Sequence, residues 1–131
     1  MKNSLYPAIW FDNSASQAFD VYCKLFARSI VKDSNPLVVS ASVYDTPFIG
    51  INGGPMFRPN NSISFMIICD SKSEINKYWN TLSDEGDVLM PLKEYPWSSY
   101  YGWLSDKYGV GWQLYMGNKN DVNNQSINGE N

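Results

Sequence analysis

Residues 14–25 and 71–82 carry the same pattern of apolar and polar positions. In each stretch four apolar residues recur at the spacing i, i+3, i+4 and i+7, which places them on one face of a helix. Each stretch also begins with a serine followed three positions later by Gln or Glu, the pattern of a capping box. The pattern therefore predicts two amphipathic helices that pack on a sheet. Their apolar positions are Ala18, Val21, Tyr22 and Leu25 in the first helix and Ile75, Tyr78, Trp79 and Leu82 in the second.

Strand-like segments surround each predicted helix in the same order. One apolar run precedes each helix and ends in an aspartate, and two or three further runs follow it. The predicted strands are residues 5–11, 37–44, 47–52 and 55–58 in the first half, and 63–69, 88–90, 98–104 and 110–116 in the second. The order βαβββ, found twice, predicts an α+β protein built from two similar modules, about residues 4–60 and 61–116.

Two segments fall outside this repeat. Residues 92–97 lie beside Pro91 and include Pro96 and several aromatic residues, which predicts an ordered loop that crosses the surface or covers a site. From Gly117 onward the chain is rich in Asn, Gly, Asp and Ser and has only two aliphatic residues. We therefore expect one domain over residues 1–116 and a disordered tail over residues 117–131.

The segment 102–113 predicts a hairpin that places a polar amide on a sheet. Asp106 and Gly109 supply the turn residues. The strand that follows alternates with a period of two, so Gln113 faces away from the large hydrophobic residues Trp112 and Leu114. Gln113 is thus a candidate to line a pocket, although an amide bonded to neighbouring backbone or facing solvent would fit the pattern equally.

These segments resemble the PhnB-like branch of the vicinal oxygen chelate superfamily, which also contains glyoxalase I and the bleomycin and fosfomycin resistance proteins. The resemblance covers about residues 4–116 and is most specific in 102–113. The other matching segments are 10–12, 18–26, 52–55, 64–65, 79–82 and 85–86. It implies paired βαβββ modules that form a cupped mixed sheet around a pocket, as in the glyoxalase/bleomycin resistance-type fold, and it implies a homodimer. Some members carry a demethylubiquinone methyltransferase name, but this chain has no glycine-rich nucleotide fingerprint to support it.

In metal-dependent relatives the ligands, usually His, Glu or Gln, come from the first and last strand of each module. Projected onto this chain, these positions fall at about Pro7 and Met56 in the first module, and at Ile63 or Ser64 and Gln113 in the second. Only Gln113 is well suited to coordinate a metal, and the chain contains no histidine. A divalent cation held by one neutral amide would lose more hydration than it regained. We therefore expect no metal and no other cofactor at this site.

Without a metal, the most plausible ligand of the cup is a small organic molecule. Gln113 would orient it by hydrogen bonds, and Ser64 would face the same space. Aromatic and apolar side chains would supply surfaces for stacking, although such residues also build cores and interfaces. The residues expected to line the cup with them are Trp10, Met56, Trp97, Tyr100 and Tyr115. Trp103 and Trp112 are assigned instead to the core or to the dimer interface.

Composition excludes several other classes of function. The chain of 131 residues has a net charge of −3 and no basic cluster, which argues against nucleic acid as a partner. No apolar run reaches the length of about 18 residues that a membrane span needs, and no signal-peptide pattern is present. We therefore expect a cytoplasmic protein with no membrane partner. Cys23 and Cys69 are predicted to be reduced thiols. Two thiols without any histidine are too few ligands for a zinc site.

No pair of a nucleophile and a base stands out in the sequence. Asp12 and Asp70 each precede a predicted helix, where a carboxylate stabilises the helix N-terminus, so we do not assign them a catalytic role. The leading hypothesis is a PhnB-like protein that binds a small molecule without a metal. The alternatives are a glyoxalase/dioxygenase-type enzyme that uses a divalent metal held by other residues, and a dimeric interaction protein with a vestigial pocket. Whether the protein is an enzyme stays open at this point.

Overall fold

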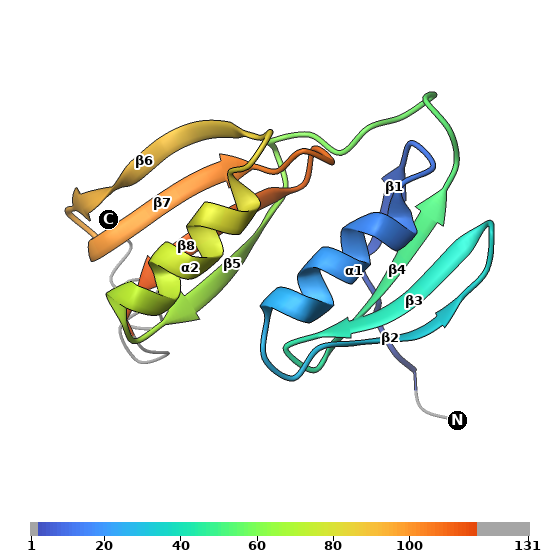
Figure 1. The fold of residues 1–131 in the computed structure, drawn as a ribbon, viewed down its shortest axis with the longest axis horizontal. Helices are drawn as coiled ribbons and strands as arrows, with labels where there is room; N and C mark the ends of the chain where they lie inside the picture. Colours follow the sequence, from blue (N-terminus) through green and yellow to red (C-terminus); the bar gives the residue numbers. More distant parts are fainter. Residues whose placement is uncertain (1–2, 118–131) are drawn as a thin grey trace. The chain divides into compact units, whose positions relative to one another are not determined.

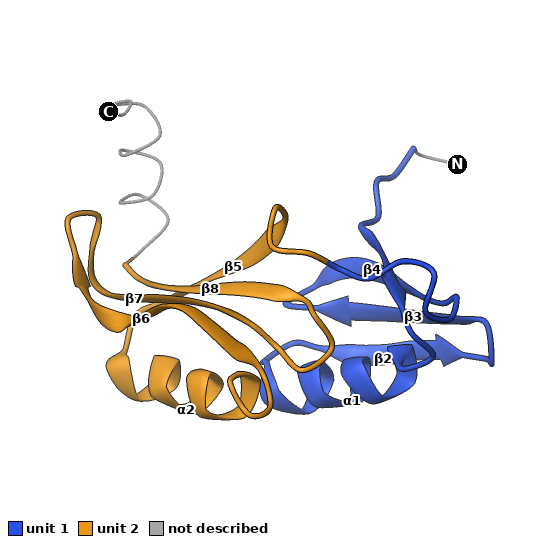
Figure 2. Ribbon diagram, turned by 90° about the horizontal axis from the view of Figure 1, so that it is seen from above, with its two compact units in different colours: residues 1–59 blue, residues 60–131 orange. Residues whose placement is uncertain are grey.

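The computed structural model describes residues 3–117, so the predicted tail lies outside the described residues except for Gly117. The chain divides into two compact units, Met1–Pro59 and Asn60–Asn131, which Figure 2 shows in blue and orange. Neither helix of the described chain, at 11 residues each, has the length and apolar character to cross a bilayer. Cys23 and Cys69 are both free thiols, as predicted.

Unit 1 is a four-stranded mixed sheet with one helix packed on it (Figure 1). The strand order is β1-β4-β3-β2, with β1 parallel to β4 and the other neighbours antiparallel. Helix α1 buries Ala15, Ala18, Phe19 and Tyr22 against the sheet, where the Phe19 ring meets Phe11 edge-on. The elements are β1 (Ala8–Phe11), α1 (Ala15–Leu25), β2 (Ile30–Ser34), β3 (Val38–Val43) and β4 (Thr46–Asn52).

Unit 2 repeats this topology. Its strand order is β5-β8-β7-β6, with β5 parallel to β8 and the other neighbours antiparallel. Helix α2 buries Ile75, Tyr78 and Leu82 against the sheet. The elements are β5 (Ser64–Cys69), α2 (Lys72–Leu82), β6 (Asp87–Tyr95), β7 (Ser98–Ser105) and β8 (Gly111–Met116). The predicted α+β fold of two βαβββ modules is thus confirmed.

Three sequence-based assignments of strands and loops were wrong. In unit 1 the second strand is β2, which the pattern missed because most of its side chains are exposed and mixed in polarity. The predicted strand at residues 55–58 does not form, since β4 is the last strand and ends at Asn52. In unit 2 the predicted loop at 92–97 is mostly strand, because β6 continues to Tyr95 and only a short turn precedes β7. Pro91 fits inside β6 because this strand lies at the edge of its sheet.

The two helices begin differently although their sequences suggest the same cap. At α2 the predicted cap is confirmed, since the Ser71 hydroxyl accepts a hydrogen bond from the Glu74 N–H at 3.2 Å. At α1 the Ser14 side chain makes no capping bond, and the Asn52 side-chain oxygen accepts from the Ala15 N–H at 2.9 Å instead. The junction before α1 is one residue longer, with Asn13 at a positive φ of 58°. The predicted face of α1 shifts accordingly, so Val21 and Leu25 of that stripe are only partly buried.

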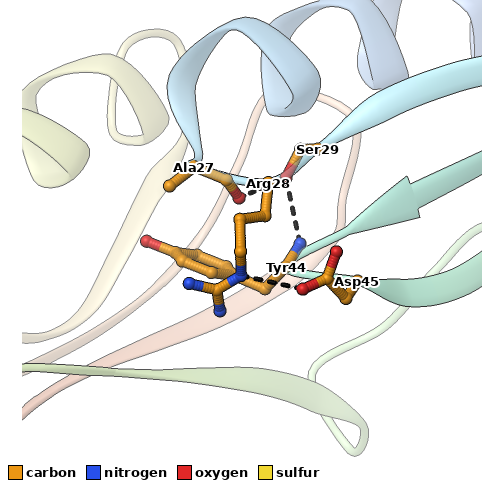
Figure 3. A network of polar contacts seen from close by, with 5 residues as sticks. All are labelled: Ala27, Arg28, Ser29, Tyr44 and Asp45. Atoms are coloured by element: carbon orange, nitrogen blue, oxygen red, sulfur yellow. Dashed lines mark hydrogen bonds and ion pairs between the residues drawn. The ribbon is translucent and has the colours of Figure 1, made fainter.

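The turn between β3 and β4 is held by the loop after α1 (Figure 3). Tyr44 and Asp45 both adopt positive φ, at 49° and 63°, which is unfavourable for residues other than glycine. The Asp45 N–H donates to the Arg28 carbonyl at 3.0 Å, and the Arg28 Nε donates to the Asp45 carboxylate at 2.8 Å. The Tyr44 N–H donates to the Ser29 hydroxyl at 3.0 Å. Both N–H groups of this strained turn are therefore bonded to the loop at Arg28 and Ser29.

Candidate functional site

The sheet of unit 2 has one face covered by α2 and one face that carries no helix among the described residues (Figure 2). Gly102 marks the covered face, because a Cβ at this position would lie 2.5 Å from the Trp79 ring on α2. Residues adjacent to Gly102 along the strand must point to the other side. We call that other side the helix-free face, and define it by Ser64, Met66, Tyr101, Trp103, Gln113 and Tyr115.

The turn at Asp106 fixes how β7 and β8 pair and therefore where Gln113 lies. The Asp106 carboxylate is buried and accepts from the N–H groups of Tyr108 and Val110 at 2.9 and 3.0 Å. Its other oxygen accepts from the Trp112 indole at 2.9 Å. Gly109 completes the turn at a positive φ of 91°. The predicted hairpin and its alternation are thus confirmed, with Trp112 in the core.

Two side chains hold the Gln113 amide in place. Its Nε2 donates to the Ser64 hydroxyl on β5 at 2.7 Å, and its Oε1 accepts from the Tyr101 hydroxyl on β7. The amide is therefore bonded to side chains on both neighbouring strands and has a defined orientation. Burial raises the pKa of the Tyr101 phenol, and the nearby Tyr95 raises that pKa further, so Tyr101 is a neutral donor at physiological pH.

Four aromatic rings gather beside this amide. Tyr95 and Trp97 stack with their ring centroids 5.1 Å apart, and Tyr101 meets both rings edge-on at 5.5 Å. Tyr115 meets Tyr101 edge-on at 6.3 Å and donates its hydroxyl to the Trp97 carbonyl at 2.6 Å. The Lys93 ammonium lies 5.2 Å from the centre of the Tyr95 ring. We call the four rings the aromatic cluster.

Four of the predicted site residues meet in unit 2, namely Ser64, Trp97, Gln113 and Tyr115. Tyr100 does not, and its assignment to the same site is corrected. It alternates with Tyr101 and so lies on the covered face, where its hydroxyl donates to Asn76 of α2. The Lys72 ammonium, from the same helix, lies 5.2 Å from the centre of the Tyr100 ring.

The other two predicted residues, Trp10 and Met56, belong to unit 1. The Trp10 indole on β1 donates to the Gly54 carbonyl at 2.9 Å and meets the Phe57 ring edge-on at 5.0 Å. Met56 is 76% exposed and lies outside any strand, so the projection of a last-strand position onto it was wrong. Strand register identifies Ile49 on β4 as the residue of unit 1 that corresponds to Gln113. Ile49 pairs with Ala8 on the parallel strand β1, just as Gln113 pairs with Met66 on the parallel strand β5.

Three residues of the helix-free face and its surroundings were not among the expected site residues: Tyr95, Tyr101 and Trp103. Tyr101 and Trp103 had been considered as aromatic surfaces for stacking, but neither was assigned to the site. Tyr95 was placed in a loop, and Trp103 was assigned to the core or an interface. The signal for Trp103 was present, because once Asp106 sets the turn, counting back along the hairpin places Trp103 opposite Gln113. The same register places Tyr101 on the face of Gln113 but pairs it with Tyr115, so its bond to Gln113 is a diagonal contact that the register alone does not predict.

The polar groups of the helix-free face do not fit a divalent metal ion. Among residues 3–117 no group of three or more His, Cys, Asp or Glu side chains lies together. The Gln113 oxygen already accepts from Tyr101, and Ser64 adds only a neutral hydroxyl. Hard divalent cations prefer several carboxylate or carbonyl oxygens, and transition metals prefer imidazole or thiolate as well.

Comparison with solved structures defines the class of protein. The PhnB protein from Bacillus cereus is 27% identical, with a TM-score of 0.81 over 88% of this chain and 100% of that one. PA1353 from Pseudomonas aeruginosa is 20% identical, with a TM-score of 0.72 over 88% and 98%. The fosfomycin resistance protein FosX from Listeria monocytogenes, complexed with Mn(II) and sulfate, shares the fold at 8% identity, with a TM-score of 0.69 over 96% and 98%. The two units therefore form the glyoxalase/bleomycin resistance fold of the vicinal oxygen chelate superfamily.

Within that superfamily the chain belongs to the PhnB-like family, whose model is described as 3-demethylubiquinone-9 3-methyltransferase and matches residues 3–115. The resemblance stated from the sequence is thereby confirmed. Among curated proteins no sequence matches this chain.

Proposed function

We propose that this PhnB-like protein binds a small organic molecule on the helix-free face of unit 2, and that it does so without a metal. The observation that carries the proposal is the Gln113 amide, held between Ser64 and Tyr101 beside the aromatic cluster. A fixed polar group next to flat apolar surfaces is the usual composition of a small-molecule site.

The amide keeps hydrogen-bonding capacity for a ligand. A glutamine side chain has two N–H donors and an oxygen with two lone pairs, and Ser64 and Tyr101 use one of each. The stacked Tyr95 and Trp97 rings offer an apolar surface nearby, and Trp97 is 37% exposed. The site therefore combines one oriented polar contact with a surface for stacking.

Binding without chemistry fits these groups better than catalysis. General acid–base catalysis works best with a group whose pKa lies near the operating pH. The Tyr101 pKa is raised above its ordinary value, so the phenol stays protonated and serves as a hydrogen-bond donor. Metal-dependent catalysis would need ligands that the helix-free face does not supply.

A ligand titration tests this proposal directly. Protein treated with EDTA and confirmed to be metal-free would be titrated with a panel of small aromatic compounds, and two-dimensional ¹H–¹⁵N spectra would follow the Gln113 side-chain NH₂ signals. We expect at least one compound to shift these signals, and Gln113→Leu to weaken its binding about tenfold. Tyr100→Phe, on the covered face of the same sheet, is the matched control and should bind as the wild type does. Binding only after a divalent metal is restored, or no shift at Gln113 with any compound, would contradict the proposal.

The homodimer implied by the family resemblance is part of the same proposal. Light scattering during size-exclusion chromatography should give twice the mass of one chain. The mass of one chain at all concentrations would contradict the proposed dimer, but it would not affect the proposed binding site of unit 2.

A further inference from the structure

Trp103 carries a polar atom that has no hydrogen-bond partner among the described residues. Its indole Nε1 is buried and unbonded. The indole groups of Trp10 and Trp112, in contrast, donate to the Gly54 carbonyl and the Asp106 carboxylate, each at 2.9 Å. Buried N–H groups are almost always paired in folded proteins, so an unpaired one calls for an explanation.

Strand register places the Trp103 side chain beside the proposed site. Trp103 on β7 pairs directly with Gln113 on β8, and the two strands are antiparallel. Residues that pair directly in this way project from the same face, with Cβ atoms about 4.5–5.5 Å apart. The side chain that carries the unpaired donor therefore projects from the helix-free face next to the Gln113 side chain.

The free hydrogen-bonding groups at this point of the face are mainly donors. One N–H of Gln113 is bonded to Ser64 and the other is not, while the Ser64 hydroxyl receives that bond and keeps its own hydrogen. The Gln113 oxygen already accepts from Tyr101. Trp103, Gln113 and Ser64 thus have three unbonded hydrogens, and the oxygens of Gln113 and Ser64 each already accept one hydrogen bond.

The charges nearby are compatible with an anion. None of the six residues that define the helix-free face is charged. Lys93 pairs with Tyr101 across β6 and β7, and its ammonium lies over the Tyr95 ring of the aromatic cluster. A cationic ligand would meet the positive ends of three donors and this ammonium, whereas a carboxylate would be stabilised by all of them.

We propose that the ligand is a small aromatic carboxylic acid whose carboxylate accepts hydrogen bonds from Trp103 Nε1, Gln113 Nε2 and the Ser64 hydroxyl. Its ring packs against the aromatic cluster, where Trp97 is the most accessible ring. This assignment rests on the proposed function and narrows it to one class of ligand. It also makes Trp103 a ligand-binding residue.

Benzoate is the probe for this inference, with benzylamine, benzyl alcohol and acetate as comparisons. In ¹H–¹⁵N spectra of the wild-type protein, benzoate should move the Trp103 indole N–H signal downfield, as a new hydrogen bond to a carboxylate does. Benzylamine and benzyl alcohol should bind at least tenfold more weakly, because they lack the carboxylate. Acetate should also bind at least tenfold more weakly, because it lacks the ring.

Trp103→Phe removes the N–H group and keeps an aromatic ring. We expect this variant to lose at least tenfold in benzoate affinity while its melting temperature stays equal to or above that of the wild type, because an unpaired buried donor is lost. Trp112→Phe is the matched comparison, and it should lower the melting temperature because its indole is bonded to Asp106.

The outcomes separate this inference from the proposed function. If benzylamine or benzyl alcohol shifts the Gln113 signals as strongly as benzoate does, the carboxylate assignment is wrong and the binding site stands. If Trp103→Phe folds and binds benzoate with unchanged affinity, Trp103 is not a ligand-binding residue. If none of these probes moves a signal of the helix-free face while another compound of the panel shifts the Gln113 signals, the carboxylate assignment is wrong and the proposed function stands. The wild-type spectra decide the carboxylate question even if Trp103→Phe fails to fold.

Discussion

The two units of this protein share a topology but differ in what their sheets present on the face without a helix. Both have the same strand order and the same parallel pair. In unit 2, Gln113 lies opposite Trp103, whereas the corresponding position in unit 1 holds Ile49, opposite Ser40. The features present in both units are those the fold needs. The amide, its two side-chain partners and the unpaired indole occur in unit 2 alone among the described residues, so the shared topology does not require them.

The largest contrast should come from the aspartates in the last hairpin of each unit. Asp106 is buried and accepts three hydrogen bonds, whereas Asp45 forms an exposed ion pair with Arg28. Asp106→Asn places an NH₂ group against a donor, so we expect a loss of about 2–4 kcal/mol in the free energy of unfolding. Asp45→Asn should cost less than about 1 kcal/mol, because exposed ion pairs contribute little and Asn tolerates positive φ. Urea unfolding followed by tryptophan fluorescence measures both, and equal losses would mean that the two turns are equally important.

A smaller effect is expected from the glycines that face the helices. A Cβ at Gly102 would lie 2.5 Å from Trp79 and 2.8 Å from Leu92, so Gly102→Ala should destabilise the protein by about 1–3 kcal/mol. Gly50→Ala in unit 1 should cost less, because the nearest atom is the edge of the Phe19 ring at 2.8 Å. Thermal unfolding of the two variants shows which one loses more stability. A larger loss of stability in Gly50→Ala would contradict our inference that α2 packs more closely on its sheet than α1 does.

The helix caps should differ by about 1 kcal/mol. Ser71→Ala removes the bond to the Glu74 N–H and should cost about that amount. Ser14→Ala should change the free energy of unfolding by only a few tenths of a kcal/mol, because the Ser14 side chain makes no capping bond. Asn52→Ala should produce in unit 1 the loss that Ser71→Ala produces in unit 2. Equal losses for the two serines, measured by urea unfolding, would show that Ser14 caps α1 in solution.

The last contrast is absent at neutral pH and appears only in alkali. Burial, together with the smaller effects of Glu74 and Asp70, raises the pKa of the Cys69 thiol from 9.0 to about 12. The folded state therefore holds this proton more tightly than the unfolded state, so the stability it contributes is present below pH 9 and is lost as the pH rises towards 12. Phe11 takes the corresponding place at the end of β1, so no thiol titrates there.

Comparing the wild type with Cys69→Ala between pH 8 and 11 isolates the contribution of the Cys69 thiol to the free energy of unfolding, because all other groups titrate in both proteins. We expect the difference in the free energy of unfolding between them to grow with pH above 9, with the wild type losing more. Iodoacetamide at pH 8 should also modify the half-buried Cys23 before Cys69. Faster labelling of Cys69 in the folded protein would contradict its buried, protonated state.

The sequence alone predicted the parts of the fold that depend on local pattern. The two helices follow from the spacing of their apolar residues, and the last hairpin follows from Asp106 and Gly109. The alternation in β8 was sufficient to place Gln113 on the face away from α2. The family resemblance placed Ser64 on the same face, and the hydrogen bond between Gln113 and Ser64 agrees with that placement.

The errors arose where contacts distant in sequence override local preference. Asn52 replaces Ser14 as the cap of α1 only because β4 ends beside the start of that helix. The tyrosine pair at 100 and 101 shows the same limit. Both residues look alike in sequence, and only the pairing of β7 with β8 decides which one reaches Gln113 and which one reaches α2.

The outer strands β2 and β6 have a consequence for how this protein behaves at high concentration. Both lie at sheet edges, and both pair irregularly with their neighbours, with register shifts after Val31 in β2 and at three places in β6. Pro91 also removes one backbone donor from β6. An irregular edge cannot align a regular ladder of hydrogen bonds with a strand from another molecule. These two edges should therefore resist the strand-to-strand addition that leads folded β proteins into aggregates.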